Sequence, residues 1–525
     1  MDLKSIIYET IEKQFNITSK DDIPSFDLQL TPDIGMGEYA VPVGFVLAKK
    51  LKMAPDKIAE QIAENMHGPF EAHYVKGFVN IRMSDDWWLS RLNEAFVSYP
   101  HITGNALVEF VSANPTGPVH IGHGRGAVVG SILTNVLSRV YDKADSEFYI
   151  NDAGEQIRKF CNSVEVRIRQ LKGEQVELPE DSYHGDYVVD IAKKVLGTYD
   201  WDHLNEEQKW NVLWNGAVSM MEEWHKATLD KLGVMMNIWT SERRIRAEKW
   251  PEKVLELLGE KHLTYEQEDA LWFKSTAFGD DKDRVLVKSN GEYTYYLVDI
   301  AYHLEKISRG YDVLVDVWGA DHIGHLSRMN SALTALGFEN RLNVVLVQTV
   351  RFWRQGVAVA MSKRKGEFLS LDELIEEIGK DAARIMFVSR SVDATLDFDI
   401  DVAKQKAMDN PVYYIQYAYV RARNILMKEQ ERQYGDAKGF DTYERTLLRL
   451  LNAYEDRIAQ TVRKMDPFVL ESYAWDLSDA FHKFYQFDRV VGCEYENSRW
   501  LLTERFVEVM EELFDILGIE KLEHM

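Results

Sequence analysis

The clearest change of hydrophobic pattern in the chain lies between residues 107 and 140. A short apolar segment, Leu107 to Val111, precedes a loop rich in proline and glycine. An apolar stripe at three- and four-residue spacing follows, made of Val129, Ile132, Leu133, Val136, Leu137 and Val140. This order predicts a strand, a tight turn and a helix. Because the first N–H groups of a helix are unpaired and lie at its positive end, the turn is a candidate phosphate site.

Further short apolar segments in the middle of the chain predict strands, at 284–287, 293–299, 313–318 and 344–347. Unbroken apolar strands separated by helices are typical of a parallel sheet that is covered on both faces. Such sheets bind ligands at the carboxyl ends of their strands. Polar residues stand at or near these predicted ends, namely Asp299, Asp321, His322 and Gln348.

The pattern on either side of this region differs from it. Residues 1–103 combine an amphipathic opening helix with an alternating segment at 76–82 that predicts a strand. The chain from about residue 400 is helical to its end. We therefore expect an α/β protein with three domains. They are an N-terminal α/β module (1–103), a parallel-sheet domain (104–399, with an acidic helical insertion at about 156–260) and an all-helical C-terminal domain (400–525).

Two aromatic stripes at helical spacing allow either packing or binding. The first comprises Trp210, Leu213, Trp214, Ala217, Met221 and Trp224. A buried seam is a commoner use of such a stripe than a ligand-binding box. The second puts Tyr413 and Tyr417 beside Arg421 and Arg423. Aromatic rings with interleaved arginines can stack on unpaired RNA bases, although the sequence alone favours a packed core here.

Composition narrows the class of protein. With 46% hydrophobic and 28% charged residues, the 525-residue chain matches a soluble globular protein. No apolar run approaches the roughly 20 residues of a membrane span, and the acidic N-terminus does not resemble a signal peptide. Two distant cysteines, Cys161 and Cys493, fit a reducing compartment, so we expect a cytoplasmic location. The net charge of −23 does not exclude RNA, because local clusters govern binding.

The glycine-rich turn itself has two interpretations. Gly122 to Ala127 (G-H-G-R-G-A) is close to a dinucleotide fingerprint, and the acids Asp142, Asp145 and Glu147 lie about twenty residues further on. The tetrapeptide His120-Ile121-Gly122-His123 instead matches the motif that opens class I aminoacyl-tRNA synthetases. The turn alone does not decide between a nicotinamide-type oxidoreductase and a synthetase.

The rest of the chain favours the second interpretation. His120–His123, followed about 240 residues later by Met361-Ser362-Lys363, resembles a class I aminoacyl-tRNA synthetase. Further strings resemble the arginyl-tRNA synthetases in particular. They are Glu109-Phe110 leading to Ser112-Ala113-Asn114-Pro115, Tyr149–Gly154, Tyr295 with Asp299, Gly319–His322, Val347–Arg351 and Asn410–Arg423. The resemblance covers nearly the whole chain in the family's order.

This resemblance implies a reaction and its partners. Arginine and ATP would give arginyl-adenylate and pyrophosphate, and the arginyl group would pass to the 3′ end of its tRNA. The N-terminal module would contact the outer corner of the tRNA, and the C-terminal bundle would read the anticodon. Between them, the parallel-sheet domain would be a Rossmann-type catalytic domain. Family members generally need tRNA for activation and are mostly monomers. We therefore expect L-arginine, ATP with Mg²⁺ and arginine tRNA as partners, with neither a membrane nor a structural zinc.

The resemblance also implies catalytic and ATP-binding residues. Catalysis would fall to His120, His123, Ser362 and Lys363. ATP would contact His120, Gly122, His123, Asp321, His322, Gln348, Met361 and Lys363. The two histidines would stabilise charge on the α-phosphate, and Lys363 would stabilise the leaving pyrophosphate. Ala360 stands where the family's second motif usually begins with a lysine, and we expect Arg364 or Lys365 to supply the missing charge.

The implied arginine site comprises Glu109, Ser112, Ala113, Asn114, His123, Tyr295, Asp299 and His322. The Asp299 carboxylate would accept the guanidinium bidentately, and Tyr295 would pack along the aliphatic stem of the substrate. Glu109 would either add a second negative charge or form a structural ion pair. The implied tRNA contacts are Tyr413, Tyr417, Arg421 and Arg423.

Two rival functions remain for comparison with the structure. An oxidoreductase explains the glycine turn but gives no role to residues 361–363 or to a helical C-terminal domain. A non-catalytic tRNA-binding relative would be expected to lose His120, His123 or Lys363, and all three are present.

Overall fold

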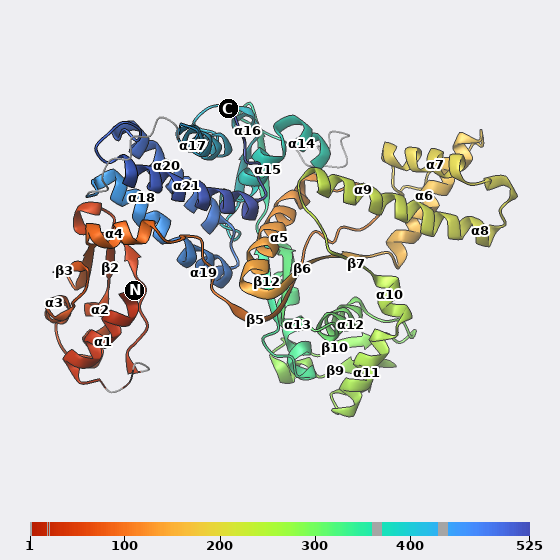
Figure 1. Cartoon of the computed structure of the whole chain (residues 1–525). Helices are drawn as coiled ribbons and strands as arrows, with labels where there is room; N and C mark the ends of the chain where they lie inside the picture. The colour runs from red at the N-terminus through yellow and green to blue at the C-terminus, as the bar shows by residue number, and fades with distance from the viewer. Residues whose placement is uncertain (1–2, 18, 20–21, 360–369, 429–438) are drawn as a thin grey trace.

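The structure, a computed structural model, describes residues 3–17, 19, 22–359, 370–428 and 439–525. Figure 1 shows the N-terminal module packed against the C-terminal helices, while a group of helices projects from the opposite side of the central sheet. No helix within the described ranges is long and apolar enough to cross a membrane. Cys161 and Cys493 are both free thiols.

A five-stranded parallel sheet forms the centre of the molecule, as the apolar segments predicted. Its strand order is β12 (Leu342–Val347), β11 (Val313–Gly319), β5 (Ile102–Glu109), β6 (Tyr141–Ile150) and β7 (Ile238–Ser241). Helix α5 (Ile121–Val140) connects β5 to β6, and its predicted apolar stripe is buried. The loop between β5 and α5 therefore lies at the carboxyl edge of the sheet.

Two predicted strands have other positions. Residues 284–287 form β10 (Arg284–Val287), in a small antiparallel sheet with β9 (Ala270–Phe273) and β8 (Thr264–Gln267). The prediction of a strand at 293–299 is wrong, because residues from Tyr295 onwards belong to helix α12 (Tyr295–Ser308). The Thr294 hydroxyl accepts a hydrogen bond from the Leu297 N–H at 3.3 Å and caps this helix. Tyr295 and Asp299 are therefore one helical turn apart.

The insertion is a helical unit with its own core. It contains α6 (Glu155–Leu171), α7 (Asp186–Thr198), α8 (Glu206–Asn211), a π-helical turn (Val212–Ala217) and α9 (Val218–Lys231). The chain then returns to the central sheet as β7, so the segment 156–260 is not helical throughout. Of the aromatic stripe, Leu213, Ala217 and Met221 are buried in the seam, whereas Trp224 is 37% exposed.

Helices and a second small sheet complete the central domain. Helices α10 (Glu242–Ala247), α11 (Trp250–Glu260), α12 and α13 (Ile323–Leu336) share a core beside β10. Strands β13 (Val350–Arg354), β14 (Val357–Ala358) and β15 (Leu396–Asp399) form the other sheet. Helices α14 (Leu371–Ile378), α15 (Lys380–Phe387) and α16 (Ile400–Lys404) follow residues 360–369 and flank β15.

The N-terminal module covers a four-stranded antiparallel sheet with helices. The strand order is β1 (Gln29–Leu30), β2 (Tyr39–Val41), β4 (Phe78–Met83) and β3 (Phe70–Val75). The helices are α1 (Leu3–Phe15), α2 (Val43–Leu51), α3 (Pro55–Asn65) and α4 (Asp85–Leu92). The predicted strand at 76–82 is β4. It starts two residues later than predicted because Lys76 and Gly77 take positive φ angles in the β3–β4 turn.

The C-terminal bundle is helical, as predicted. It comprises α17 (Pro411–Leu426), α18 (Thr442–Asn452), α19 (Tyr454–Lys464), α20 (Phe468–Phe487) and α21 (Glu496–Leu517). Buried Arg445 on α18 holds the N-terminal module against the bundle. Its guanidinium donates to the Glu38 carboxylate at 2.6 Å and to the Met83 carbonyl at 3.0 Å.

Candidate functional site

The turn before α5 is shaped by its two histidines. His120 is the N-cap of the helix, and its Nδ1 accepts a hydrogen bond from the Gly122 N–H at 3.0 Å. The His120 and His123 rings lie 3.9 Å apart between centroids. A Cβ at position 122 would come within 2.7 Å of the His120 ring, so glycine is required for this close approach. Both imidazoles therefore lie at the positive end of α5.

A cavity of about 750 Å³ opens in front of this turn, at the carboxyl ends of β5, β11 and β12. The predicted ATP-binding residues that line it are His120, Gly122, His123, Asp321, His322 and Gln348. Ala113 and Asn114, predicted for arginine, line it too. Asp321 and His322 belong to a short 3-10 helix (Ala320–His322) that directly follows β11. Met361, Ser362 and Lys363 lie outside the described residues.

A second cavity, of about 390 Å³, adjoins the first between β11 and α12. The two cavities share Val111, Ser112, Val317, Trp318, Gly319 and His322. The predicted arginine-binding residues that line the second cavity are Glu109, Ser112, Tyr295, Asp299 and His322. A nucleotide-sized cavity thus opens into a smaller one that is suited to an amino-acid side chain.

The smaller cavity contains an acidic side chain, Asp299, whose pKa is raised. Burial raises the pKa of Asp299 to about 7; His303 opposes this shift, and the acids Glu109, Glu242 and Asp316 add to it. No ion pair joins Asp299 to a basic side chain within the part of the chain that the structure describes. Tyr295, 71% exposed, stands one turn before it on α12. The cavity therefore offers a carboxylate that a bound cation would stabilise.

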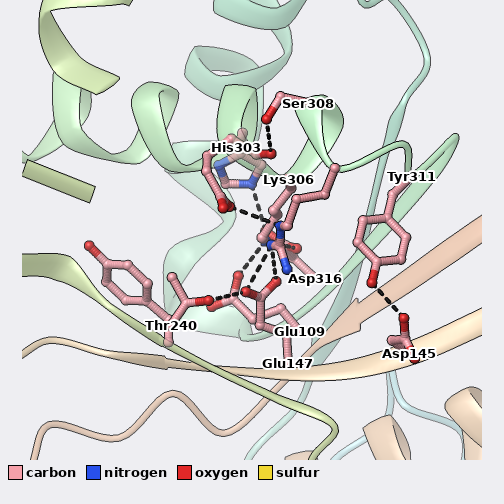
Figure 2. Close-up of polar contacts among 12 residues, drawn as sticks. Glu109, Asp145, Glu147, Thr240, His303, Lys306, Ser308, Tyr311 and Asp316 are labelled. Carbon is pink, nitrogen blue, oxygen red and sulfur yellow. Dashed lines mark hydrogen bonds and ion pairs between the residues drawn. The ribbon is translucent and has the colours of Figure 1, made fainter. Parts of the chain in front are cut away.

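A buried ionic network lies beneath this cavity (Figure 2). Lys306 on α12 is 0% exposed and donates to carboxylates of two neighbouring strands, Glu109 on β5 and Asp316 on β11, the latter at 3.0 Å. Burial alone would lower the pKa of Lys306, but the carboxylates around it outweigh burial and raise that pKa. The other Glu109 oxygen accepts from Ser112 at 2.8 Å. Glu109 thus forms the structural ion pair that was one of its two predicted roles.

His303 joins this network to the backbone of Asp299. Its Nδ1 lies 2.8 Å from the Asp299 carbonyl oxygen, and its Nε2 lies 2.8 Å from Oδ2 of Asp316. Burial would raise the pKa of Asp316, but Lys306 and His303 lower it well below its usual range, so its carboxylate is ionised. Both ring nitrogens of His303 therefore face oxygens that act only as acceptors.

The sequence pattern did not indicate this network, although a signal is present. Asp299, His303 and Lys306 are spaced as i, i+4 and i+7, which is one face of a helix. This helical spacing does not apply to a strand, which is what the pattern at 293–299 predicts.

Buried Arg125 was also not singled out from the sequence. Its guanidinium donates to the Gln348 carbonyl at 2.9 Å, and to the carbonyls of Ala394 and Ser391 at 2.8 and 2.7 Å. It thereby holds the backbone at Gln348, on the wall of the larger cavity.

The acids that a dinucleotide-binding interpretation would need are placed elsewhere. Asp142 stands at the amino end of β6 and binds the Gly104 N–H at 2.8 Å. Asp145 accepts from Tyr311, and buried Glu147 is paired with Arg309 at 2.8 Å. None of the three lines the cavity at the turn.

A separate cavity of about 760 Å³ lies in the C-terminal bundle. The Arg421 guanidinium lies over the rings of Tyr417 and Tyr485, at 4.4 and 4.5 Å from their centroids, and all three residues line the cavity. Tyr413 stacks on Tyr417. Arg423 instead donates to Glu511 on α21 at 3.3 Å and lies outside the cavity lining.

Comparison with known proteins decides the family. The model "tRNA synthetases class I (R), catalytic domain" matches residues 101–399. The models "Arginyl tRNA synthetase N terminal domain" and "DALR anticodon binding domain" match residues 1–83 and 415–525. The chain belongs to the arginyl-tRNA synthetase family. An oxidoreductase is therefore no longer favoured.

Relatives from this family span the whole chain. The arginine–tRNA ligase of Carboxydothermus hydrogenoformans is 39% identical over 530 residues, covering 96% of this chain and 95% of that protein. The arginine–tRNA ligase of Bacillus subtilis is 36% identical, covering 100% of this chain and 99% of that protein. The solved arginyl-tRNA synthetase of Thermus thermophilus has the same fold, with a TM-score of 0.78 at 21% identity over 100% of this chain and 99% of that one.

Proposed function

We propose that the chain is an arginine–tRNA ligase. It activates L-arginine with ATP to give arginyl-adenylate and pyrophosphate, and then transfers arginine to the 3′ end of its tRNA. Besides family membership, one observation carries this proposal. The nucleotide-sized cavity at the two histidines opens directly into a smaller cavity that contains the carboxyl of Asp299, which has no ion pair within the described part of the chain.

In this proposal the smaller cavity binds the arginine side chain. The guanidinium is a fork of N–H donors that fits a carboxylate, and Asp299 in this cavity is a half-buried acid without an ion pair among the described residues. Tyr295 covers the aliphatic stem. Ser112, which lines both cavities, and Ala113 and Asn114, which line the larger one, orient the α-ammonium and α-carboxylate. Glu109 acts indirectly, because Lys306 and Ser112 already engage its carboxylate.

The larger cavity binds ATP with its Mg²⁺. His120 and His123 donate toward the α-phosphate as the arginine carboxylate attacks it and pyrophosphate leaves. Donors aimed at charge that develops in the transition state contribute several kcal/mol. Lys363, with Ser362 and Met361, stabilises the leaving pyrophosphate; Arg364 or Lys365 can supply the charge that Ala360 lacks.

The tRNA spans the remaining domains. We propose that the C-terminal cavity receives an unpaired base, since Tyr417 and Tyr485 supply aromatic faces and Arg421 supplies a cation. Arg423 is a weaker candidate, because Glu511 neutralises it. The N-terminal module contacts the outer corner of the tRNA. We further propose that the enzyme acts as a cytoplasmic monomer.

Arginine-dependent exchange of pyrophosphate into ATP tests the proposal. The assay is run with each amino acid, with and without total tRNA. Exchange with arginine alone among the amino acids is the expected result. If exchange appears only when tRNA is present, the tRNA requirement also holds for this chain. No exchange with arginine and tRNA, from folded protein, would refute the ligase function.

A further inference from the structure

Helix α9 of the insertion contacts the loop that leads into the turn of His120. His225 on α9 is 1% exposed, and its Nε2 lies 2.7 Å from the Gly117 carbonyl oxygen. A carbonyl oxygen only accepts, so Nε2 carries the proton and donates. Burial lowers the pKa of His225, which agrees with a neutral ring. A hydrogen bond from the insertion therefore fixes the backbone at Gly117, three residues before His120.

The same helix also contacts the start of α14, two residues after residues 360–369. Trp224 and Thr228 donate to Oδ2 of Asp372 at 3.3 and 2.7 Å, and the Lys231 ammonium lies 2.8 Å from Oδ1. Burial would raise the pKa of Asp372, but these three partners outweigh burial and lower it. Trp224, Thr228 and Lys231 are spaced i, i+4 and i+7, so one face of α9 holds this carboxylate.

The two contacted segments also meet each other. Ser370, the N-cap of α14, forms an isolated β-bridge with His120. The capping box of Ser370 and Glu373 fixes the beginning of that helix. Another insertion helix supports the same loop, because the Tyr187 hydroxyl donates to the Thr116 carbonyl at 2.8 Å. Each of three segments, the insertion, the loop before His120 and the start of α14, thus contacts the other two.

We propose that α9 is a positioning element for adenylate formation, and that His225 and Asp372 are its two anchoring residues. This inference rests on the proposed function. Helix α9 fixes the spacing between the segment carrying His120 and the point where the chain leaves residues 360–369, which carry Lys363. Charge stabilisation in the transition state requires donors held within about 0.5 Å of their working positions. A shift of either segment therefore slows the chemical step.

The pocket for the arginine side chain is held by other contacts. Ser112 at its edge stands in the loop that α9 contacts at Gly117, but its hydroxyl donates to Glu109 at 2.8 Å. Asp299 and Tyr295 lie on α12, which packs on α11, α13 and β11. Loss of an α9 contact should therefore lower kcat while leaving the arginine KM nearly unchanged. Because a loss of folded protein would also lower the apparent kcat at an unchanged KM, kcat is expressed per folded active site.

The test substitutes His225 in two ways. His225→Leu removes the donor and leaves the Gly117 carbonyl unpaired. His225→Gln is the conservative variant, because the Gln Nε2 is the same number of bonds from Cα and can donate to the same carbonyl. Met221→Leu is the matched control, since Met221 is buried on the same helix. Each variant is assayed by arginine-dependent ATP–pyrophosphate exchange, and its folding is checked by thermal unfolding.

We expect His225→Leu to lower kcat at least about tenfold with an arginine KM within about twofold of the wild type. His225→Gln should recover most of kcat, and Met221→Leu should match the wild type. Unchanged kcat in folded His225→Leu, a Gln variant no better than Leu, or parallel changes in kcat and KM would each overturn the inference. An inactive wild-type enzyme would instead refute the proposed function.

Asp372→Asn keeps the test decisive if His225→Leu does not fold. Asparagine has nearly the same shape but cannot form an ion pair with Lys231. The same selective loss of kcat is expected, and a normal kcat in this variant would overturn the role of Asp372 and with it the inference.

Discussion

Arginine binding should depend on pH through the ionisation of Asp299. Burial, with the neighbouring acids Glu109 and Glu242, raises the pKa of this carboxyl to about 7. A raised pKa means that the empty site holds a proton below pH 7. The guanidinium stays charged at all these pH values, and it binds the ionised carboxylate. Arginine must therefore displace that proton at low pH, and its affinity falls as the pH decreases.

The magnitude follows from the position of the pKa. About nine-tenths of the sites are protonated at pH 6 and about one-tenth at pH 8. The dissociation constant of arginine should therefore be about tenfold higher at pH 6 than at pH 8, which corresponds to about 1.4 kcal/mol. Binding at pH 6 should also release about 0.9 proton per arginine.

Isothermal titration calorimetry at pH 6, 7 and 8 and constant ionic strength measures both quantities. Buffers of different ionisation enthalpy give the number of protons released. Asp299→Asn should weaken binding at pH 8 by at least about tenfold, because a charge-assisted pair contributes about 1.5–3 kcal/mol. This variant should also abolish the pH dependence, because an amide does not titrate.

The neutral isostere L-citrulline is a second control, since its affinity should not fall between pH 8 and pH 6. Equal arginine affinity at pH 6 and pH 8 would refute the reasoning. So would an Asp299→Asn variant that keeps the wild-type pH dependence.

Three other variants, one of them with a matched control, test separate parts of the molecule. Lys363→Ala should mainly lower kcat of pyrophosphate exchange; an equal loss of arginine affinity would point to misfolding instead. Arg421→Ala should weaken tRNA binding about tenfold by loss of a stacking cation, as measured by filter binding at fixed salt. Arg423→Ala, on the same helix but paired with Glu511, is its control, and equal effects of both would argue against the C-terminal cavity. Lys306→Met should destabilise the fold by about 3–5 kcal/mol in urea denaturation, because two buried carboxylates lose their cation; a loss below about 1 kcal/mol would contradict the network.

Elements with a strong local pattern could be predicted from the sequence. Three local features suffice to predict β5, the turn and α5. They are the apolar segment at 107–111, the proline–glycine turn and the stripe from Val129 to Val140. Proline at position 411 marks the start of α17 in the same way. These features depend on side chains close together in sequence, so hydrophobic period and capping residues determine them.

The segment from Tyr293 to Asp299 shows where local pattern is insufficient. Its aromatic and β-branched residues favour a strand, yet Thr294 caps a helix whose Leu297, Ile300 and Ala301 enter a core shared with α11 and α13. Burial of that apolar face outweighs the local preference. Only this helical geometry brings Lys306 to the same face as Asp299.

The sequence by itself determined the family, the parallel class of the central sheet and the residue types of the two cavities. Only the tertiary structure decided that Glu109 forms an ion pair with Lys306, 197 residues away in the sequence, and that burial raises the pKa of the Asp299 carboxyl to about 7. It also decided that α9 contacts both the loop before His120 and the start of α14. The physical reason is that ion pairing and desolvation depend on elements far apart in the chain. The local hydrophobic pattern does not indicate which of these elements will contact each other.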